Sequence, residues 1–242
     1  MYGDTNTPDF SHIEGYEDHS LNLLATYGGD GALTGILVNV PCPAQVTEGL
    51  YSLSADYWCE TRLELRRRLG ENLPILAQCS AAGDQSPHLI YEKRAASRMR
   101  ELTGLSEREE IAQRIAGAVE ELLPVIRKTA AGSLALTHTV EEIELPLAKL
   151  TEADVETARQ EAETLRRKYE EEKDRLDADP ELRAKPRWYG PATGAFRRMR
   201  WNEGVAERFQ QQEASPTRST EVHTIRLGDI AFATNPYEYY LD

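Results

Sequence analysis

Short apolar runs in the first third of the chain predict strands. Runs rich in Leu, Ile and Val occupy residues 20–27, 34–40 and 73–79 and are typical of strands. The length and flanks of the third run indicate a buried strand. The first two runs are separated by "GGDGAL", a Gly/Asp turn that favours a β-hairpin. Pro41 ends the second run, because proline cannot donate to a strand ladder.

Longer segments with apolar residues at helical spacing alternate with these strands. They predict helices over residues 54–70, 89–103 and 106–127. Ser54 and Gly70 are the expected caps of the first helix. The third begins with "SEREE", a capping serine followed by acidic residues.

The second half of the chain has a different character. Residues 133–147 alternate as a strand, whereas residues 151–213 are charged and carry acid–base pairs at helical spacing, which predicts an inserted helical hairpin. Two further strands are expected on either side of Gly228 and Asp229. The pattern predicts an α/β fold: one domain over residues 1–242, with a mixed β-sheet core, covering helices and a helical insertion at about 151–213.

Composition narrows the partners that such a domain could have. The 242 residues include 41 acidic and 28 basic side chains, a net charge of −13, which opposes loose binding to nucleic acid or to an anionic membrane surface. No run of apolar residues is long enough for a transmembrane helix, and the polar start resembles no signal peptide, so a cytoplasmic location is the default expectation. The three cysteines match no metal or redox spacing and are expected to be buried thiols. The oligomeric state stays open.

A small-residue turn follows the third predicted strand and carries candidate chemistry. In "AQCSAAGDQSPHL", Gly83 permits a tight turn, and Ser86 stands between a strand and a helix, where α/β enzymes present nucleophiles. The alternative is that Asp84 and Ser86 cap the following helix. His88 is two residues from Ser86, although positions so close seldom point the same way. The histidines form no metal-binding motif.

Near the C-terminus, Glu238 in "NPYEYY" ends a strand among aromatic residues. Such a carboxylate is either a metal ligand or a solvated surface group.

Four blocks together resemble a known family. "GILVNVPCPAQ", "SLSADYW", "LPILAQCSAAGDQSP" and "IRLGDIAFATNPYE" are similar, in this order, to blocks of the amino-terminal catalytic domain of the neutral/alkaline non-lysosomal ceramidases. The resemblance covers about residues 17–127 and 221–242. It does not extend to the charged helical section.

The resemblance implies a zinc-dependent amidase that cleaves the N-acyl bond of ceramide, giving sphingosine and a fatty acid. Ser86 and Asp84 match the family's catalytic G-D-x-S-P-N motif, with His88 in place of Asn. Gly83, Asp56 and His88 are implied substrate-binding residues, and Glu238 corresponds to a zinc-ligand glutamate.

The chain also departs from the family. Pro43 stands where a zinc histidine is expected, and proline cannot bind a metal. Cys42 next to it is an alternative ligand if the loop shifts. The remaining family ligands lie in segments that have no counterpart here, so we expect a fragment, incomplete at both ends, that holds no catalytic zinc.

Three functions therefore stay open. The first is a ceramidase-like hydrolase of ceramide or a related lipid amide. The second is an inactive ceramidase-like domain that binds through the same cleft, and the third is a structural piece of a larger assembly.

Overall fold

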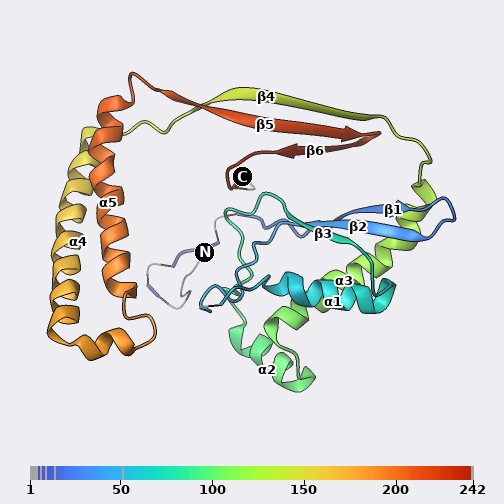
Figure 1. Cartoon of the computed structure of the whole chain (residues 1–242), viewed down its shortest axis with the longest axis horizontal. Coiled ribbons are helices and arrows are strands. Elements are labelled where there is room, and N and C mark those ends of the chain that lie inside the picture. Colours follow the sequence, from blue (N-terminus) through green and yellow to red (C-terminus); the bar gives the residue numbers. More distant parts are fainter. Residues whose placement is uncertain (1–4, 6, 9, 14, 51, 241–242) are drawn as a thin grey trace. The chain divides into compact units, whose positions relative to one another are not determined.

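The chain folds as an α/β protein that divides into two compact units (Figure 1). The computed structural model describes all residues except 1–4, 6, 9, 14, 51 and 241–242. The first unit holds residues up to Leu134 together with the C-terminal residues from Tyr237, and the second holds Ala135–Pro236.

The first unit is built on a mixed three-stranded sheet. Its strands are β1 (Asn22–Tyr27), β2 (Leu33–Val40) and β3 (Ile75–Cys79), in the order β1-β2-β3. The β1/β2 pair is antiparallel and the β2/β3 pair is parallel. The predicted hairpin and the third strand are confirmed. The prediction that the third strand is buried is wrong, because β3 is an edge strand on which Leu76 and Cys79 are exposed.

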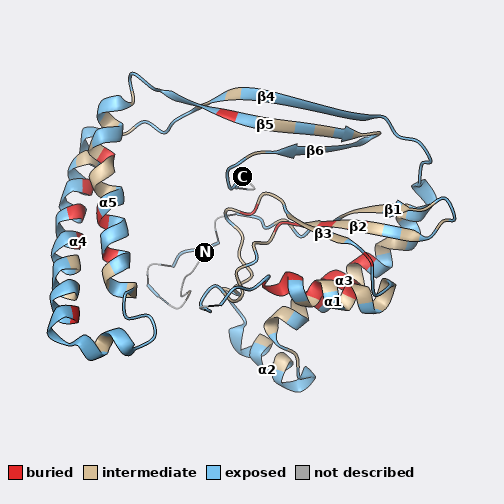
Figure 2. Ribbon diagram, in the orientation of Figure 1, coloured by how far each residue is buried: buried red, intermediate tan, exposed pale blue. Residues whose placement is uncertain are grey.

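Two helices cover one face of this sheet. Ile36, Val38 and Val40 alternate along β2 and pack against α1 (Tyr57–Leu69) and α3 (Glu107–Ile126). Figure 2 shows the buried residues concentrated on these elements. Each fully buried apolar side chain of this size contributes about 1.5–3 kcal/mol, so this layer holds the unit together.

The ends of these helices partly match the sequence prediction. Ser106 forms the expected capping box with Glu109 at the start of α3, and Gly70 ends α1. The N-cap of α1 is Asp56, not Ser54, which instead accepts a hydrogen bond from the Asp56 backbone N–H at 3.0 Å.

The helix that follows the Ser86 turn begins later than predicted. It is α2 (Lys93–Thr103), and its N-cap, Glu92, makes no side-chain capping hydrogen bond. The prediction that Asp84 and Ser86 cap a helix starting at residue 89 is therefore wrong. The reason is local, because the Ser86 hydroxyl accepts the backbone N–H of His88 at 3.2 Å and stabilises a turn instead. A short 3-10 helix, η1 (Arg127–Thr129), follows α3.

The second unit is an antiparallel sheet with a helical hairpin inserted into it. Its strands β4 (Leu136–Pro146), β5 (Thr217–Leu227) and β6 (Ile230–Thr234) pair in the order β4-β5-β6. Between β4 and β5 the chain forms α4 (Glu152–Ala178), the 3-10 helix η2 (Pro180–Ala184) and α5 (Gly190–Gln211). The predicted strand, helical insertion and terminal hairpin are present.

A row of buried alanines and larger apolar residues holds the two long helices together. Ala158, Ala162 and Leu165 on α4 and Ala195 and Met199 on α5 are buried, whereas most other positions of both helices are exposed. A capping box between Thr151 and Asp154 starts α4. This narrow apolar seam explains how so charged a segment forms a stable hairpin.

Candidate functional site

The carboxyl ends of β2 and β3 bring two loops to the same edge of the first sheet. Val40 is paired with Cys79 in the parallel register, and the Ser80 N–H donates to the Val40 carbonyl at 3.2 Å. Loops that follow parallel strands lie together at this edge, which is where open α/β sheets usually bind ligands. Residues 41–50 and 52–56 belong to one of these loops, and residues 80–92 form the other.

The C-terminal segment joins this edge through a close contact with Gly83. The Gly83 N–H donates to the Tyr239 carbonyl at 2.7 Å. A Cβ at Gly83 would lie 3.1 Å from that oxygen and 3.2 Å from the Tyr240 ring. Glycine therefore permits the close approach of a second backbone, and the contact places the segment that carries Glu238 beside the turn that carries Ser86.

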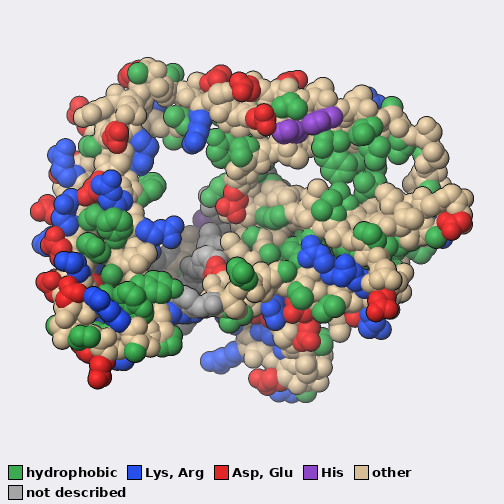
Figure 3. All heavy atoms as spheres, viewed as in Figure 1, with side chains coloured by type: hydrophobic (Ala, Val, Ile, Leu, Met, Phe, Trp, Pro, Cys, Tyr) green, Lys and Arg blue, Asp and Glu red, His purple; other side chains and the backbone are tan. Residues whose placement is uncertain are grey.

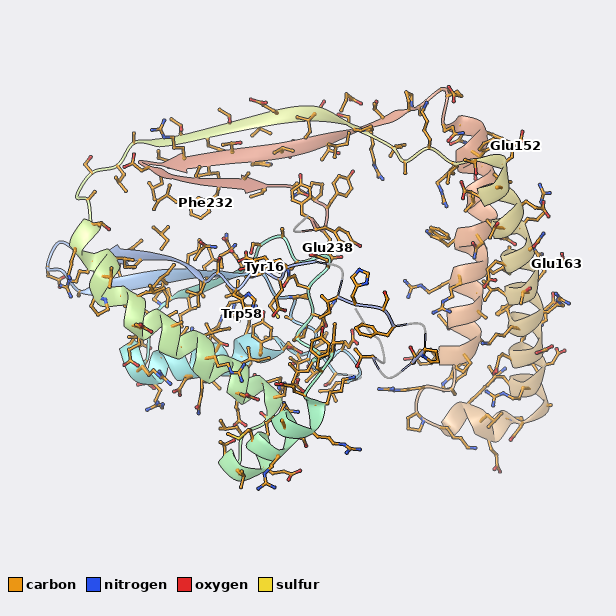
Figure 4. All side chains as sticks on the ribbon, turned by 180° about the vertical axis from the view of Figure 1, so that it is seen from behind. Tyr16, Trp58, Glu152, Glu163, Phe232 and Glu238 are labelled. Carbon is orange, nitrogen blue, oxygen red and sulfur yellow. The ribbon has the colours of Figure 1, made fainter. Side chains whose placement is uncertain are left out.

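Glu238 acts electrostatically on the end of β3. Although the residue is exposed, partial burial of its sulfur raises the pKa of the Cys79 thiol. The Cys42 backbone N–H lowers this pKa, and the negative charge of Glu238 raises it. Figure 4 shows Glu238 beside the loop that follows β3, in the same unit as Trp58 of α1. The carboxylate thus belongs to the edge where both motif blocks meet.

The Ser86 side chain contacts the backbone of His88. The Ser86 hydroxyl accepts the His88 N–H, while His88 Nε2 lies 3.7 Å from Glu48 Oε1. The imidazole is directed at a carboxylate in the loop after β2. Ser86 lies in the predicted turn after a strand that ends at Cys79, and this part of the prediction is confirmed.

The Asp56 carboxylate accepts several hydrogen bonds from neighbouring residues of the first unit. Its carboxylate accepts the backbone N–H groups of Val46 at 3.2 Å, Thr47 at 2.7 Å and Tyr57 at 2.8 Å. It also accepts the Thr47 hydroxyl at 2.6 Å. Burial alone would raise the pKa of Asp56, but these hydrogen bonds outweigh burial and hold the pKa below its usual value. The carboxylate therefore anchors the loop after β2 to the start of α1.

Cys42 is a poor candidate for a replacement metal ligand. Burial is the main cause that raises the pKa of its thiol to about 11, and nearby negative groups add to this. Metals bind the thiolate, which is a minor form of this side chain at neutral pH. The other two cysteines are exposed, so the prediction of three buried thiols is wrong for Cys59 and Cys79.

The described residues do not fit the zinc centre that the resemblance implies. Within the described part of the chain, no three His, Cys, Asp or Glu side chains come together in a way that could hold a metal ion. Pro43 offers no side-chain ligand atom, and burial raises the pKa of the Cys42 thiol to about 11, which disfavours the thiolate that a metal binds. Glu238 alone does not make such a centre.

Apolar side chains are exposed on the loops of this edge. They come from the loop before α1, the loop before α2 and the C-terminal segment: Leu50, Leu53, Leu89, Tyr91, Tyr239 and Tyr240. Leu53 is fully exposed. Sequence reasoning did not identify these side chains, because single exposed apolar residues in loops carry no periodic signal.

The chain was compared with known proteins as a whole. No family model, no curated protein and no solved structure matches it. None of the described helices has the length and hydropathy needed to cross a membrane.

Proposed function

We propose that the first unit is part of a ceramidase-type hydrolase that acts on the N-acyl bond of ceramide or a related lipid amide. The observation that carries the proposal is the 2.7 Å hydrogen bond from the Gly83 N–H to the Tyr239 carbonyl. It joins the two blocks for which the resemblance implies site residues, although the whole second unit separates them in the sequence. Such a contact is expected if both blocks serve one site.

The chemistry of the edge suits an amide with apolar substituents. Hydrolysis adds water across the C–N bond, so the acyl carbon gains the hydroxyl group and the amine nitrogen gains a hydrogen. In this proposal the Ser86 hydroxyl contacts the reacting carbonyl, Asp84 and Gly83 shape the turn, and His88 contacts the substrate. The exposed Leu and Tyr side chains of the surrounding loops would contact the hydrocarbon chains.

The residues at the other positions of the family's site favour a second function. Pro43 replaces a ligand, the described residues do not form a metal centre, and the Asp56 carboxylate is occupied by four hydrogen bonds. A ceramidase-like domain that binds a lipid amide without cleaving it agrees with these observations.

The two functions are separated by measuring binding and hydrolysis on the same protein. A short-chain fluorescent ceramide is incubated with the whole chain, release of the fatty acid is followed, and binding is measured by fluorescence anisotropy. The hydrolase proposal expects turnover that Ser86→Ala lowers at least tenfold. Ser97→Ala on α2, where the hydroxyl donates to Glu101 Oε1 at 3.4 Å, is the matched control.

Each outcome decides between the alternatives. Binding without release of fatty acid supports the inactive binding domain. Turnover that is unchanged in Ser86→Ala removes Ser86 from the proposal. A protein that neither binds nor cleaves the ceramide contradicts both functions.

A further inference from the structure

Two histidines from different strands of the second unit meet on one face of its sheet. His138 on β4 is opposite Ile225, and His223 on β5 is opposite Val140, so the two side chains are diagonal neighbours. His138 Nε2 lies 2.9 Å from His223 Nδ1, and the ring planes differ by 15°. Figure 3 shows histidine side chains together on this ribbon of strands.

A carboxylate fixes the proton positions of this pair. Glu221 Oε1 lies 3.1 Å from His223 Nε2. An ionised carboxylate can only accept, so Nε2 of His223 carries the proton and Nδ1 presents its lone pair to His138. The N–H between the two rings is therefore donated by His138 Nε2.

We propose that His138 and His223 bind a divalent copper- or nickel-type metal ion, with Glu221 as the positioning residue. The ion would take the place of the hydrogen shared by the two rings. His138 then carries its proton on Nδ1 and stays neutral, so the exchange leaves the charge of both rings unchanged. A carboxylate on the far nitrogen of a ligating histidine is a recurrent feature of metal sites, since it orients the ring and raises its basicity.

The ligand type indicates the class of metal. Sites with imidazole donors suit Cu²⁺ and Ni²⁺, and among divalent first-row metals Cu²⁺ binds such sites most tightly. The 2.9 Å between the two nitrogens is the hydrogen-bond distance of the metal-free pair. It brings the donors near enough that a rotation of the rings would direct both lone pairs at one ion.

The site is accessible and open. His138 is exposed and the His223 side chain is about one-third exposed. Only two protein donors converge among the described residues, so water fills the remaining positions and the affinity is below that of a four-ligand structural centre. A bound ion would join β4 to β5, the strands that enter and leave the helical hairpin. The inference concerns the second unit and does not rest on the proposed hydrolase function.

The test is titration of the whole metal-free chain with Ni²⁺ in a buffer that does not bind metal, followed by calorimetry. We expect one ion per chain, and at least a tenfold loss of affinity in His138→Gln and in His223→Gln. His19→Gln is the matched control, because that imidazole also contacts a glutamate, Glu17, but faces no second histidine among the described residues. Far-UV circular dichroism and the metal-free melting temperature verify that each variant folds.

A second measurement separates positioning from a general loss of structure. Glu221→Gln keeps both ligands, so it should weaken Ni²⁺ binding by about 10–100-fold without abolishing it. With Cu²⁺, electron paramagnetic resonance should show two nitrogen donors in the native chain and fewer in His138→Gln. The proposal is overturned if the native chain binds no Ni²⁺ at millimolar concentration, or if the double variant H138Q/H223Q binds as tightly as the native chain.

Discussion

Asp56→Ala is expected to lower the free energy of unfolding of the first unit by about 3–5 kcal/mol. The carboxylate is 4% exposed and accepts four hydrogen bonds from three residues. Hydrogen bonds to a charged group are worth about 1.5–3 kcal/mol each, but their losses are not additive, because water reaches some of the released donors. The expected loss of about 3–5 kcal/mol includes the loss of the Asp56 cap of α1.

The destabilisation by Asp56→Ala should depend on pH. The hydrogen bonds hold the pKa of Asp56 below its usual value, despite the opposing effect of burial. The carboxylate therefore contributes its full stabilisation above the unfolded pKa, about 3.9, and loses it as the pH falls through the lower, folded pKa. The difference between native protein and variant should be constant from pH 5 to pH 8 and shrink below about pH 4.

Urea denaturation at pH 7 and at pH 3 measures both effects. The first unit is followed by the fluorescence of Trp58, which is 7% exposed on α1, in a background where Trp188 and Trp201 are phenylalanine. The matched control is Asp30→Ala, since this exposed carboxylate accepts the Ala32 N–H at 3.0 Å. We expect a loss of about 1 kcal/mol or less for the control. Equal losses in the two variants, or a difference that persists unchanged at pH 3, would refute the reasoning.

Further predictions concern packing, capping and reactivity. Gly83→Ala should destabilise the first unit by about 1–3 kcal/mol, because its Cβ would lie 3.1 Å from a backbone carbonyl. Gly29→Ala, where no atom lies within 4 Å, is its control, and equal urea midpoints would contradict the close approach. Ser106→Ala should cost about 1 kcal/mol through the lost capping box, measured in the same way; a loss below 0.3 kcal/mol, roughly, would count against the cap. Cys42, with its pKa raised to about 11, should react with iodoacetamide at pH 7.5 more slowly than exposed Cys59, as mapped by mass spectrometry; faster labelling of Cys42 would disprove this.

Local structure was determined by the sequence wherever a short pattern was enough. The alternation along residues 34–40, the Gly/Asp turn before it and the serine and acids at residue 106 each describe contacts within a few residues. The charged hairpin could be predicted for the same reason, since α4 carries its own capping box and both helices carry acid–base pairs at helical spacing. Such features depend on backbone geometry and near neighbours, so they are readable without the fold.

The tertiary structure decided what the polar side chains do. Asp56 anchors a loop because the Thr47 backbone and side chain donate to it. A side chain at Gly83 would be crowded because a segment from the far end of the chain passes close to it. His138 and His223 meet only through the register of β4 and β5, which no short pattern specifies. In each case the partner lies outside any local helix, strand or turn pattern. The free energy of the contact depends on distance and burial, which are set only when the strands pair and the loops close.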